Sequence, residues 1–353
     1  MAFLIYGASG YTGQLITERA HQLGLNPVLA GRNVDKIKPL AEQFGFAHKI
    51  FDLEDEPVLD EVLNDFQVVL HCAGPFKFTA KPMMQACLRT ATHYLDITGE
   101  IEIFEYARHV GPKAEKAGIM LMPGVGFDVV PTDCLGLYLK KQLPDATQLS
   151  LGFAGLGPAG WSVGTASTAV VNFGKGSAAR EAGKIEIVPV GHKSRWISFK
   201  EKKLFFVSIP WGDVSTAYHT TGIPNIVTYT GMKPAQYKWV KRQKYFNWLL
   251  AMPWVRKLAL SRIRKGPAGP TAEERRTTDT FVWGEVVNES GQTKRASLIT
   301  PNGYSLTAEA SLILVQKVMN GELKTGFQTP ASAYGEDLVL EVGRVSRKDE
   351  SGF

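Results

Sequence analysis

The stretch Phe3-Leu-Ile-Tyr-Gly-Ala-Ser-Gly-Tyr-Thr-Gly13 decides the fold of the first part of the chain. Its first four residues form an apolar run of the length that a buried strand needs. Three glycines follow at three-residue spacing, and a helical stretch begins near Tyr11. In a dinucleotide-binding unit the first glycine permits a tight turn, the second lets the backbone approach a diphosphate, and the third lets helix pack on strand. The order of strand, glycine loop and helix therefore predicts a dinucleotide site.

The same loop supplies the groups that we expect to hold the diphosphate. The N-terminus of the following helix offers free N–H groups to an anion, and Ser9 and Thr12 add hydroxyl donors. The alternative is a glycine turn that binds no ligand. The predicted diphosphate-binding residues are Gly7, Ala8, Ser9, Gly10, Tyr11, Thr12 and Gly13.

The end of a second expected strand, at 27–30, indicates which dinucleotide is bound. The position about 20 residues past the glycine loop is normally acidic where the ribose 2′-hydroxyl is free. Here it is Arg32, with Lys36 on the helix that follows. A guanidinium pairs with a 2′-phosphate and stacks on adenine, whereas a carboxylate would repel the phosphate. The expected cofactor is therefore NADP, and the alternative is that Arg32 is an ordinary surface arginine.

Strands and helices alternate through the first 140 residues, which is typical of a doubly wound parallel sheet covered on both faces. Ligands of such sheets bind at the carboxyl ends of the strands. Asp52 lies at one of these ends, where we expect it to bind adenine together with the Leu53 N–H, or to cap the next helix. Ala73, Gly74 and Pro75 come after the following strand, where a small residue and a glycine let the backbone pass close to the ribose and diphosphate.

The chain is long enough for two domains with sizeable cores. Beyond residue 145 short strands of period two dominate, which indicates an α+β domain on a mostly antiparallel sheet. We therefore expect a Rossmann domain over 1–145 and a substrate and dimerisation domain over 146–304. A C-terminal segment over 305–353, with a clear helix at 305–319, is expected to return to the first domain.

Composition narrows the class of protein. The apolar start lacks the basic segment of a secretory signal, and no apolar run reaches the roughly 18 residues of a spanning helix. Cys72, Cys87 and Cys134 form no C-x-x-C pair, and the histidines are scattered. These features favour a cytoplasmic protein without a metal site.

The net charge of +6 is a local feature, because the stretch 238–265 contains nine Lys or Arg and no Asp or Glu. The rest of the chain is slightly acidic, so we expect no nucleic-acid partner. Tryptophan, phenylalanine and leucine are interleaved with these cations, and Pro253 breaks the stretch into two short helices. One interpretation is weak peripheral contact with a membrane. The other is a helical pair that packs on its own sheet or on a dimer partner.

Hydride transfer to or from a carbon that bears oxygen or nitrogen also needs a side chain that donates or accepts a proton. Asp96 lies in a polar cluster with Thr98 and Glu100 at one expected strand end, and Asp128 lies at the next. Asp128 is flanked by Phe127 and Val129, and an apolar cleft would raise its pKa. Our candidates for this role are Asp128, Asp96 and His219. The alternatives are that Asp128 and Asp133 cap the helix that starts near residue 131, and that His219 is structural.

Four stretches together resemble the saccharopine dehydrogenase-like oxidoreductases, and the branch of the trans-acting enoyl reductases resembles the chain most. They are Tyr6-Gly-Ala-Ser-Gly-Tyr-Thr-Gly13, His71-Cys-Ala-Gly-Pro-Phe76, Tyr94-Leu-Asp-Ile-Thr-Gly-Glu100 and Pro123-Gly-Val-Gly-Phe-Asp-Val-Val-Pro-Thr-Asp133. The resemblance covers the first 140 residues well, the last 50 moderately and the middle weakly. It implies an NADP-dependent oxidoreductase with a second domain that forms a homodimer. It does not name the substrate, because proteins of one fold differ in their pockets.

The expected function is NADP-dependent hydride transfer to or from an organic substrate. A first alternative is a lipid-directed enoyl reductase at membranes, for which a hydroxyl such as that of a tyrosine would replace the carboxylate as proton donor. A second alternative is a non-catalytic NADP-binding scaffold that works through partners.

Overall fold

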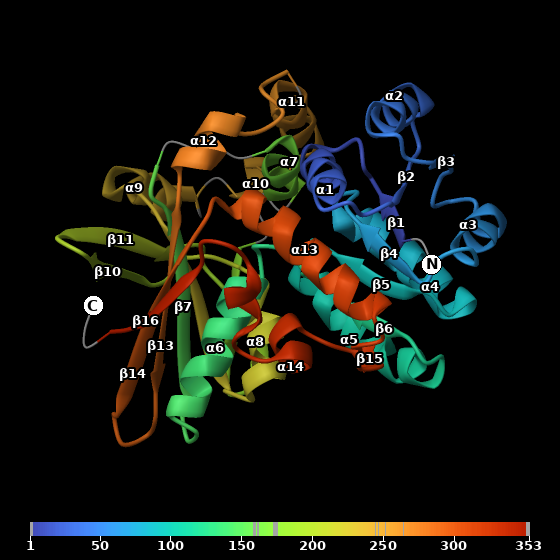
Figure 1. The fold of residues 1–353 in the computed structure, drawn as a ribbon. Coiled ribbons are helices and arrows are strands. Elements are labelled where there is room, and N and C mark those ends of the chain that lie inside the picture. The colour runs from blue at the N-terminus through green and yellow to red at the C-terminus, as the bar shows by residue number, and fades with distance from the viewer. Residues whose placement is uncertain are drawn as a thin grey trace. The chain divides into compact units, whose positions relative to one another are not determined.

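The computed structural model of the chain describes residues 3–157, 160, 162–171, 176–243, 245, 247–250, 252–263 and 265–350. The chain divides into two compact units (Figure 1). The first is built from Met1–Val130 and Gly303–Tyr334, and the second from Pro131–Asn302 and Gly335–Phe353.

Within the described residues, the first unit contains a seven-stranded sheet in the order β15-β6-β5-β4-β1-β2-β3, in which every strand pair is parallel. Its strands are β1 (Phe3–Tyr6), β2 (Val28–Gly31), β3 (His48–Ile50), β4 (Val68–His71), β5 (His93–Asp96), β6 (Met120–Met122) and β15 (Gly326–Phe327). The chain winds outward from β1 in both directions, so the order reverses between β1 and β4. Such a switch point is where ligands bind in doubly wound sheets.

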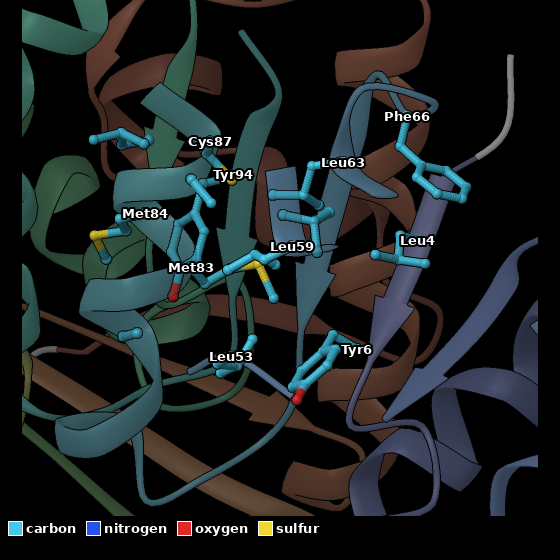
Figure 2. Packing of buried hydrophobic residues seen from close by; sticks show 14 of the residues in the cluster. Leu4, Tyr6, Leu53, Leu59, Leu63, Phe66, Met83, Met84, Cys87 and Tyr94 are labelled. Atoms are coloured by element: carbon cyan, nitrogen blue, oxygen red, sulfur yellow. The ribbon is translucent and has the colours of Figure 1, made fainter. Parts of the chain in front are cut away.

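Helices alternate with strands through the N-terminal part of the first unit, as the sequence predicts, and its C-terminal part adds two more helices. They are α1 (Tyr11–Gln22), α2 (Val34–Phe44), α3 (Glu56–Leu63), α4 (Phe76–Thr90), α5 (Ile101–Lys116), α13 (Gly303–Met319) and α14 (Pro330–Tyr334). Figure 2 shows how α3 and α4 cover the sheet, with Leu59 and Met83 turned toward Tyr6 and Tyr94 of the strands. On another side α13 runs beside α1 (Figure 1), where Glu309 accepts two hydrogen bonds from Arg19.

The second unit contains a nine-stranded mixed sheet within the described residues. Its strands are β7 (Gln148–Gly155), β8 (Ser177–Glu181), β9 (Lys184–Val188), β10 (Ser194–Phe199), β11 (Lys202–Ser208), β12 (Asn225–Gly231), β13 (Thr280–Val287), β14 (Thr293–Thr300) and β16 (Ser346–Asp349). The pair of β12 with β7 is parallel, and the other recorded pairs are antiparallel. The predicted fold class, a Rossmann domain with a second α+β domain on a mostly antiparallel sheet, is confirmed.

The helices of this part of the chain are α6 (Val130–Gln142), α7 (Val163–Val171), α8 (Asp213–Thr221), α9 (Pro234–Gln243), α10 (Asn247–Leu250), α11 (Pro253–Ile263), α12 (Ala272–Thr277) and the 3-10 turn η1 (Leu338–Glu341). The stretch 238–265 therefore contains parts of three helices, where the sequence predicts two. Pro253 opens α11, a position that suits proline because its missing N–H has no partner within the helix.

The unit boundaries differ from the expected 145 and 305. The first unit ends at Val130 because the body of α6 packs on the second sheet. A Cβ placed on Gly284 of β13 would lie 2.7 Å from Leu139 Cδ1 and 3.2 Å from Leu135 Cδ2, so glycine permits this close approach. The expected C-terminal segment is also divided, because β16 pairs with β14 and places 335–353 in the second unit.

Candidate functional site

Gly7 forms the turn at the end of β1, at the switch point of the sheet. Its φ is +84°, a left-handed conformation that favours glycine, and its N–H donates to the Ala30 carbonyl at 2.8 Å. A Cβ at Gly7 would lie 2.7 Å from the Ala73 backbone nitrogen. Glycine is therefore required here for two reasons, and it brings the loop after β1 against the loop after β4.

The other two loop glycines have different surroundings. A Cβ on Gly13 would lie 2.9 Å from the Ala8 Cα, so Gly13 lets α1 pack against its own loop. A Cβ on Gly10 would meet a single atom within 4 Å, the Gly7 carbonyl oxygen at 3.3 Å, and Gly10 is exposed. The space above Gly10 is thus open beside the N-terminus of the 12-residue helix α1. This cradle, which a side chain would fill, suits a diphosphate.

Arg32 follows β2, and its side chain is 74% exposed. One of its terminal nitrogens, Nη1, lies 3.8 Å from Oδ2 of Asp52, whose side chain is 46% exposed. A pair this long and exposed contributes little to stability, so it leaves the guanidinium available to an anion. Arg32 and Asp52 also line an open hollow of about 510 Å³ with Asn33, Val34 and Asp35. Lys36 lies exposed one turn further along α2.

The carboxylate of Asp52 accepts the backbone N–H of Glu54 at 3.2 Å, whereas Asp55 caps α3 by accepting the Val58 N–H. Asp52 is therefore not the cap of that helix. Leu53 is 7% exposed and belongs to the core of the first unit. Beyond β4, the Ala73 carbonyl accepts a hydrogen bond from Thr79 at 2.6 Å, and Gly74 is exposed.

Asp96 is fully buried at the end of β5, where it joins two strand ends. Its Oδ1 accepts the backbone N–H groups of Thr98 at 2.9 Å and Gly124 at 3.0 Å. Its Oδ2 accepts the Tyr94 hydroxyl at 2.6 Å. Burial raises the pKa of Asp96 to about 7, although these three hydrogen bonds oppose the rise. All three contacts hold backbone or core in place, so the geometry makes Asp96 an anchor of the site.

Asp128 is half-buried and lies against the loop that follows β5. A Cβ on Gly99 would lie 2.6 Å from Asp128 Oδ2, so glycine makes room for this carboxylate. Burial, and to a smaller extent the charge of Glu100, raise the pKa of Asp128 to about 7. A carboxyl group with this pKa is able to give and take a proton near neutral pH. Helix α6 begins two residues after Asp128.

Other predicted site residues belong to the second unit. There Thr220 donates to the Asp133 carboxylate at 2.5 Å, which links α8 to α6. His219 precedes it in α8, and its ring lies 6.1 Å from that of Tyr218. Asp133 thus joins two helices of the second unit, and the role of His219 remains a prediction.

Two residues of α13 lie beside the predicted cofactor loop and the loop of Asp128, and the sequence did not suggest them. The ring of Tyr304 meets that of Tyr11 edge-on at 5.1 Å. The hydroxyl of Thr307 accepts the Phe127 N–H at 3.0 Å, and Gly126 leaves room for its side chain. The separation of 180 residues between Thr307 and Phe127 removes any local signal of this contact.

Searched over the described residues, the structure has no helix long and apolar enough to cross a membrane. The expected cytoplasmic location remains a prediction.

Comparison with known proteins extends these observations. The model of the saccharopine dehydrogenase NADP binding domain matches residues 3–122. The saccharopine dehydrogenase-like oxidoreductase of Mus musculus is 29% identical over 252 residues, which are 62% of this chain and 58% of that protein. The chain thus spans little more than half the length of this relative. The trans-acting enoyl reductase of Mycobacterium ulcerans is 30% identical over 140 residues, 37% of this chain and 33% of that protein.

Among solved structures, the apo saccharopine dehydrogenase (L-Glu forming) of Saccharomyces cerevisiae has a similar fold. Its TM-score is 0.68 with 14% identity, over 99% of this chain and 100% of that one. At this identity the likeness concerns the fold alone. The predicted resemblance is confirmed: residues 3–122 match the saccharopine dehydrogenase NADP binding domain, and the chain is similar to a saccharopine dehydrogenase-like oxidoreductase over 62% of its length.

Proposed function

We propose that the chain is an NADP-dependent oxidoreductase that transfers a hydride to or from an organic substrate. The observation that carries the choice of NADP is the exposed Arg32 guanidinium at the end of β2, whose one ion pair among the described residues is the 3.8 Å contact with Asp52. A 2′-phosphate would gain a charge-assisted hydrogen bond there. The match of residues 3–122 to the saccharopine dehydrogenase NADP binding domain supports a dinucleotide as the cofactor.

The first unit offers each part of the cofactor a group of suitable chemistry. The loop Gly7–Gly13, with Ser9, Tyr11 and Thr12, would hold the diphosphate at the N-terminus of α1. Arg32 and Lys36 would bind the 2′-phosphate, and Asp52 with the Leu53 N–H would address the adenine. Ala73, Gly74 and Pro75 would lie beside the ribose. The nicotinamide, when bound, supplies or accepts the hydride.

Asp128 is the proton-handling group in this proposal. Its pKa of about 7 lets it hold a proton at neutral pH and release it when the substrate develops negative charge. Burial raises this pKa and the charge of Glu100 adds to the rise, while Gly99 lets the carboxylate lie close to the loop after β5. Asp96 positions the same loop without contacting the substrate.

Fluorescence or calorimetric titration with NADP and NAD tests the cofactor assignment. The unmodified protein should bind NADP more tightly, and Arg32→Asp should remove or reverse that preference. Arg108→Asp is the matched control, because Arg108 is an exposed arginine of α5 paired only with Glu105 within the described residues. Equal affinity of the unmodified protein for both cofactors would contradict the proposal. Binding of NADP without turnover of any carbonyl, imine or enoyl substrate would favour the scaffold.

A second candidate is enoyl reduction of a lipid substrate. The likeness to a trans-acting enoyl reductase favours it, as do the tryptophans exposed on the second unit. The test is loss of NADPH absorbance with enoyl thioesters of increasing chain length. Activity that persists in Asp128→Asn would indicate a hydroxyl donor in place of the carboxylate.

A further inference from the structure

The helices α9, α10 and α11 carry large aromatic side chains in solvent. Trp239 is 74% exposed, Trp248 65% and Trp254 61%, and Tyr245 is exposed to a similar degree. Tryptophan is on average a highly buried residue, and a group of exposed ones marks an interaction surface. We call the described residues of 238–265 the basic aromatic surface; within it α10 and α11 are in contact with each other. Residues 244, 246, 251 and 264 lie outside the described part of the chain.

Helix α9 shows that its tryptophan is not needed for packing. The inner side of α9 consists of Tyr237 and Val240, both close to Gly191. Tyr237 donates to the Gly191 carbonyl at 3.0 Å, and its ring lies 5.3 Å from Phe205. Trp239 projects away from this anchor, among exposed Lys and Arg. The helix is thus fixed through one side while a cationic and aromatic side remains in water.

Helix α11 repeats the pattern more strongly. It has 11 residues, and none of its described side chains is buried. Trp254, Leu258 and Arg262 follow at four-residue spacing, so they share one exposed side of the helix. Lys257 adds a cation to it. A helix with apolar and cationic side chains but no buried residue resembles those that lie in the plane of a membrane interface.

The charge of the surface decides between its possible occupants. The described residues of 238–265 include seven cations and no anion. Among the described residues, Lys238, Arg242 and Lys257 form no ion pair. A two-fold contact between copies of this surface would place these cations against one another, which like-charge repulsion opposes. An anionic membrane offers negative headgroups to the cations and an apolar layer beneath them to the tryptophans.

We propose that the basic aromatic surface binds reversibly to membranes that contain anionic phospholipids. The cations attract the headgroups, and Trp239, Trp248 and Trp254 insert their rings at the level of the headgroups. No helix needs to cross the bilayer. This inference stands apart from the cofactor assignment, because it concerns residues of the second unit only.

Cosedimentation with vesicles tests the proposal. Vesicles of phosphatidylcholine with and without 30 mol% phosphatidylserine are compared at low and at physiological salt. We expect binding to the anionic vesicles that is at least about tenfold stronger than to the neutral ones and that weakens with salt. The triple variant Lys238→Glu, Arg242→Glu, Lys257→Glu should lose at least about tenfold in binding. The control Lys113→Glu, Lys116→Glu, Lys184→Glu makes the same change of charge at exposed lysines elsewhere and should bind within about twofold of the parent.

Insertion of the aromatic rings has its own test. Trp239→Ala with Trp254→Ala should weaken binding, whereas Trp196→Ala, at an exposed tryptophan of β10, should not. Circular dichroism and thermal unfolding verify that each variant is folded. Lack of binding to anionic vesicles at low salt would overturn the proposal. So would equal binding by the triple variant and its control. A dimer that dissociates in the Trp239→Ala, Trp254→Ala variant, without vesicle binding, would assign the surface to a second copy instead.

Discussion

The carboxylate of Glu100 accepts the backbone N–H of Phe76, the first residue of α4, at 2.9 Å, and the Lys77 N–H at 3.1 Å. Helix α4 has Pro75 at its N-cap, which offers no side-chain acceptor. Glu100 therefore satisfies two of the free N–H groups from a different loop. One carboxylate thus ties the loop of Ala73–Pro75 to the loop that faces Asp128.

Replacing Glu100 by Ala should lower the free energy of unfolding by about 1–2 kcal/mol, because two N–H groups at the start of α4 lose their acceptor. It should also lower the pKa of Asp128, since the neighbouring negative charge is removed. Urea denaturation gives the first quantity, and NMR titration of the carboxyl gives the second. Glu102→Ala is the control, because its 3.9 Å pair with Lys77 is exposed and should contribute less than about 0.5 kcal/mol. Equal losses in both variants would contradict the capping role.

Asp96→Ala should be among the most destabilising single changes in the first unit. It leaves the Thr98 and Gly124 N–H groups and the Tyr94 hydroxyl buried without their acceptor, at a cost of about 3 kcal/mol or more. Asp96→Asn keeps an oxygen for the two N–H groups and should cost much less. Thermal unfolding of both variants measures the difference. If Asp96→Asn were as damaging as Asp96→Ala, the charge rather than the hydrogen bonds would hold the loop.

Asp128→Asn should stabilise the folded protein at alkaline pH. The folded-state pKa of Asp128 is raised to about 7, so the folded protein favours the protonated carboxyl group. The stability that this group contributes is fully present below its ordinary pKa and is lost as pH rises through 7. Asparagine does not titrate and escapes this loss. The variant should therefore match the parent near pH 4 and exceed it by on the order of 2 kcal/mol above pH 7. Unfolding curves from pH 4 to 8 measure this, and a difference that does not change with pH would refute the raised pKa.

The loop glycines should separate binding from folding. Gly10→Val places a branched side chain in the open space above the loop, so NADP binding should be lost while stability falls by only about 1 kcal/mol. Gly13→Ala drives a Cβ into the backbone of Ala8 and should destabilise the fold itself. Titration with NADP and thermal unfolding distinguish the two. Normal cofactor binding by Gly10→Val would place the dinucleotide elsewhere.

The sequence predicted the Rossmann architecture because its signals are local. Apolar runs of strand length, the spacing of Gly7, Gly10 and Gly13, and helical periodicity each depend on neighbouring residues. The strand Phe3–Tyr6 has the bounds of the apolar run that predicted it. In the second unit the sequence indicated short strands of period two but not their order, because pairs such as β12 with β7 and β14 with β16 join segments that are far apart in the chain.

The tertiary structure decided what depends on contacts between distant segments. The assignment of α6 to the second unit follows from the fit of Leu139 over Gly284, and the position of the C-terminal tail follows from the pairing of β16 with β14. We propose Asp96 as an anchor rather than an acid because it accepts hydrogen bonds from Tyr94, Thr98 and Gly124. Residue type and spacing specify a strand, a glycine turn or a cationic helix. They do not specify which carboxylate stays accessible and which has all its acceptor positions occupied by hydrogen bonds. That is decided only when the chain folds, because the hydrogen-bond partners lie on different elements.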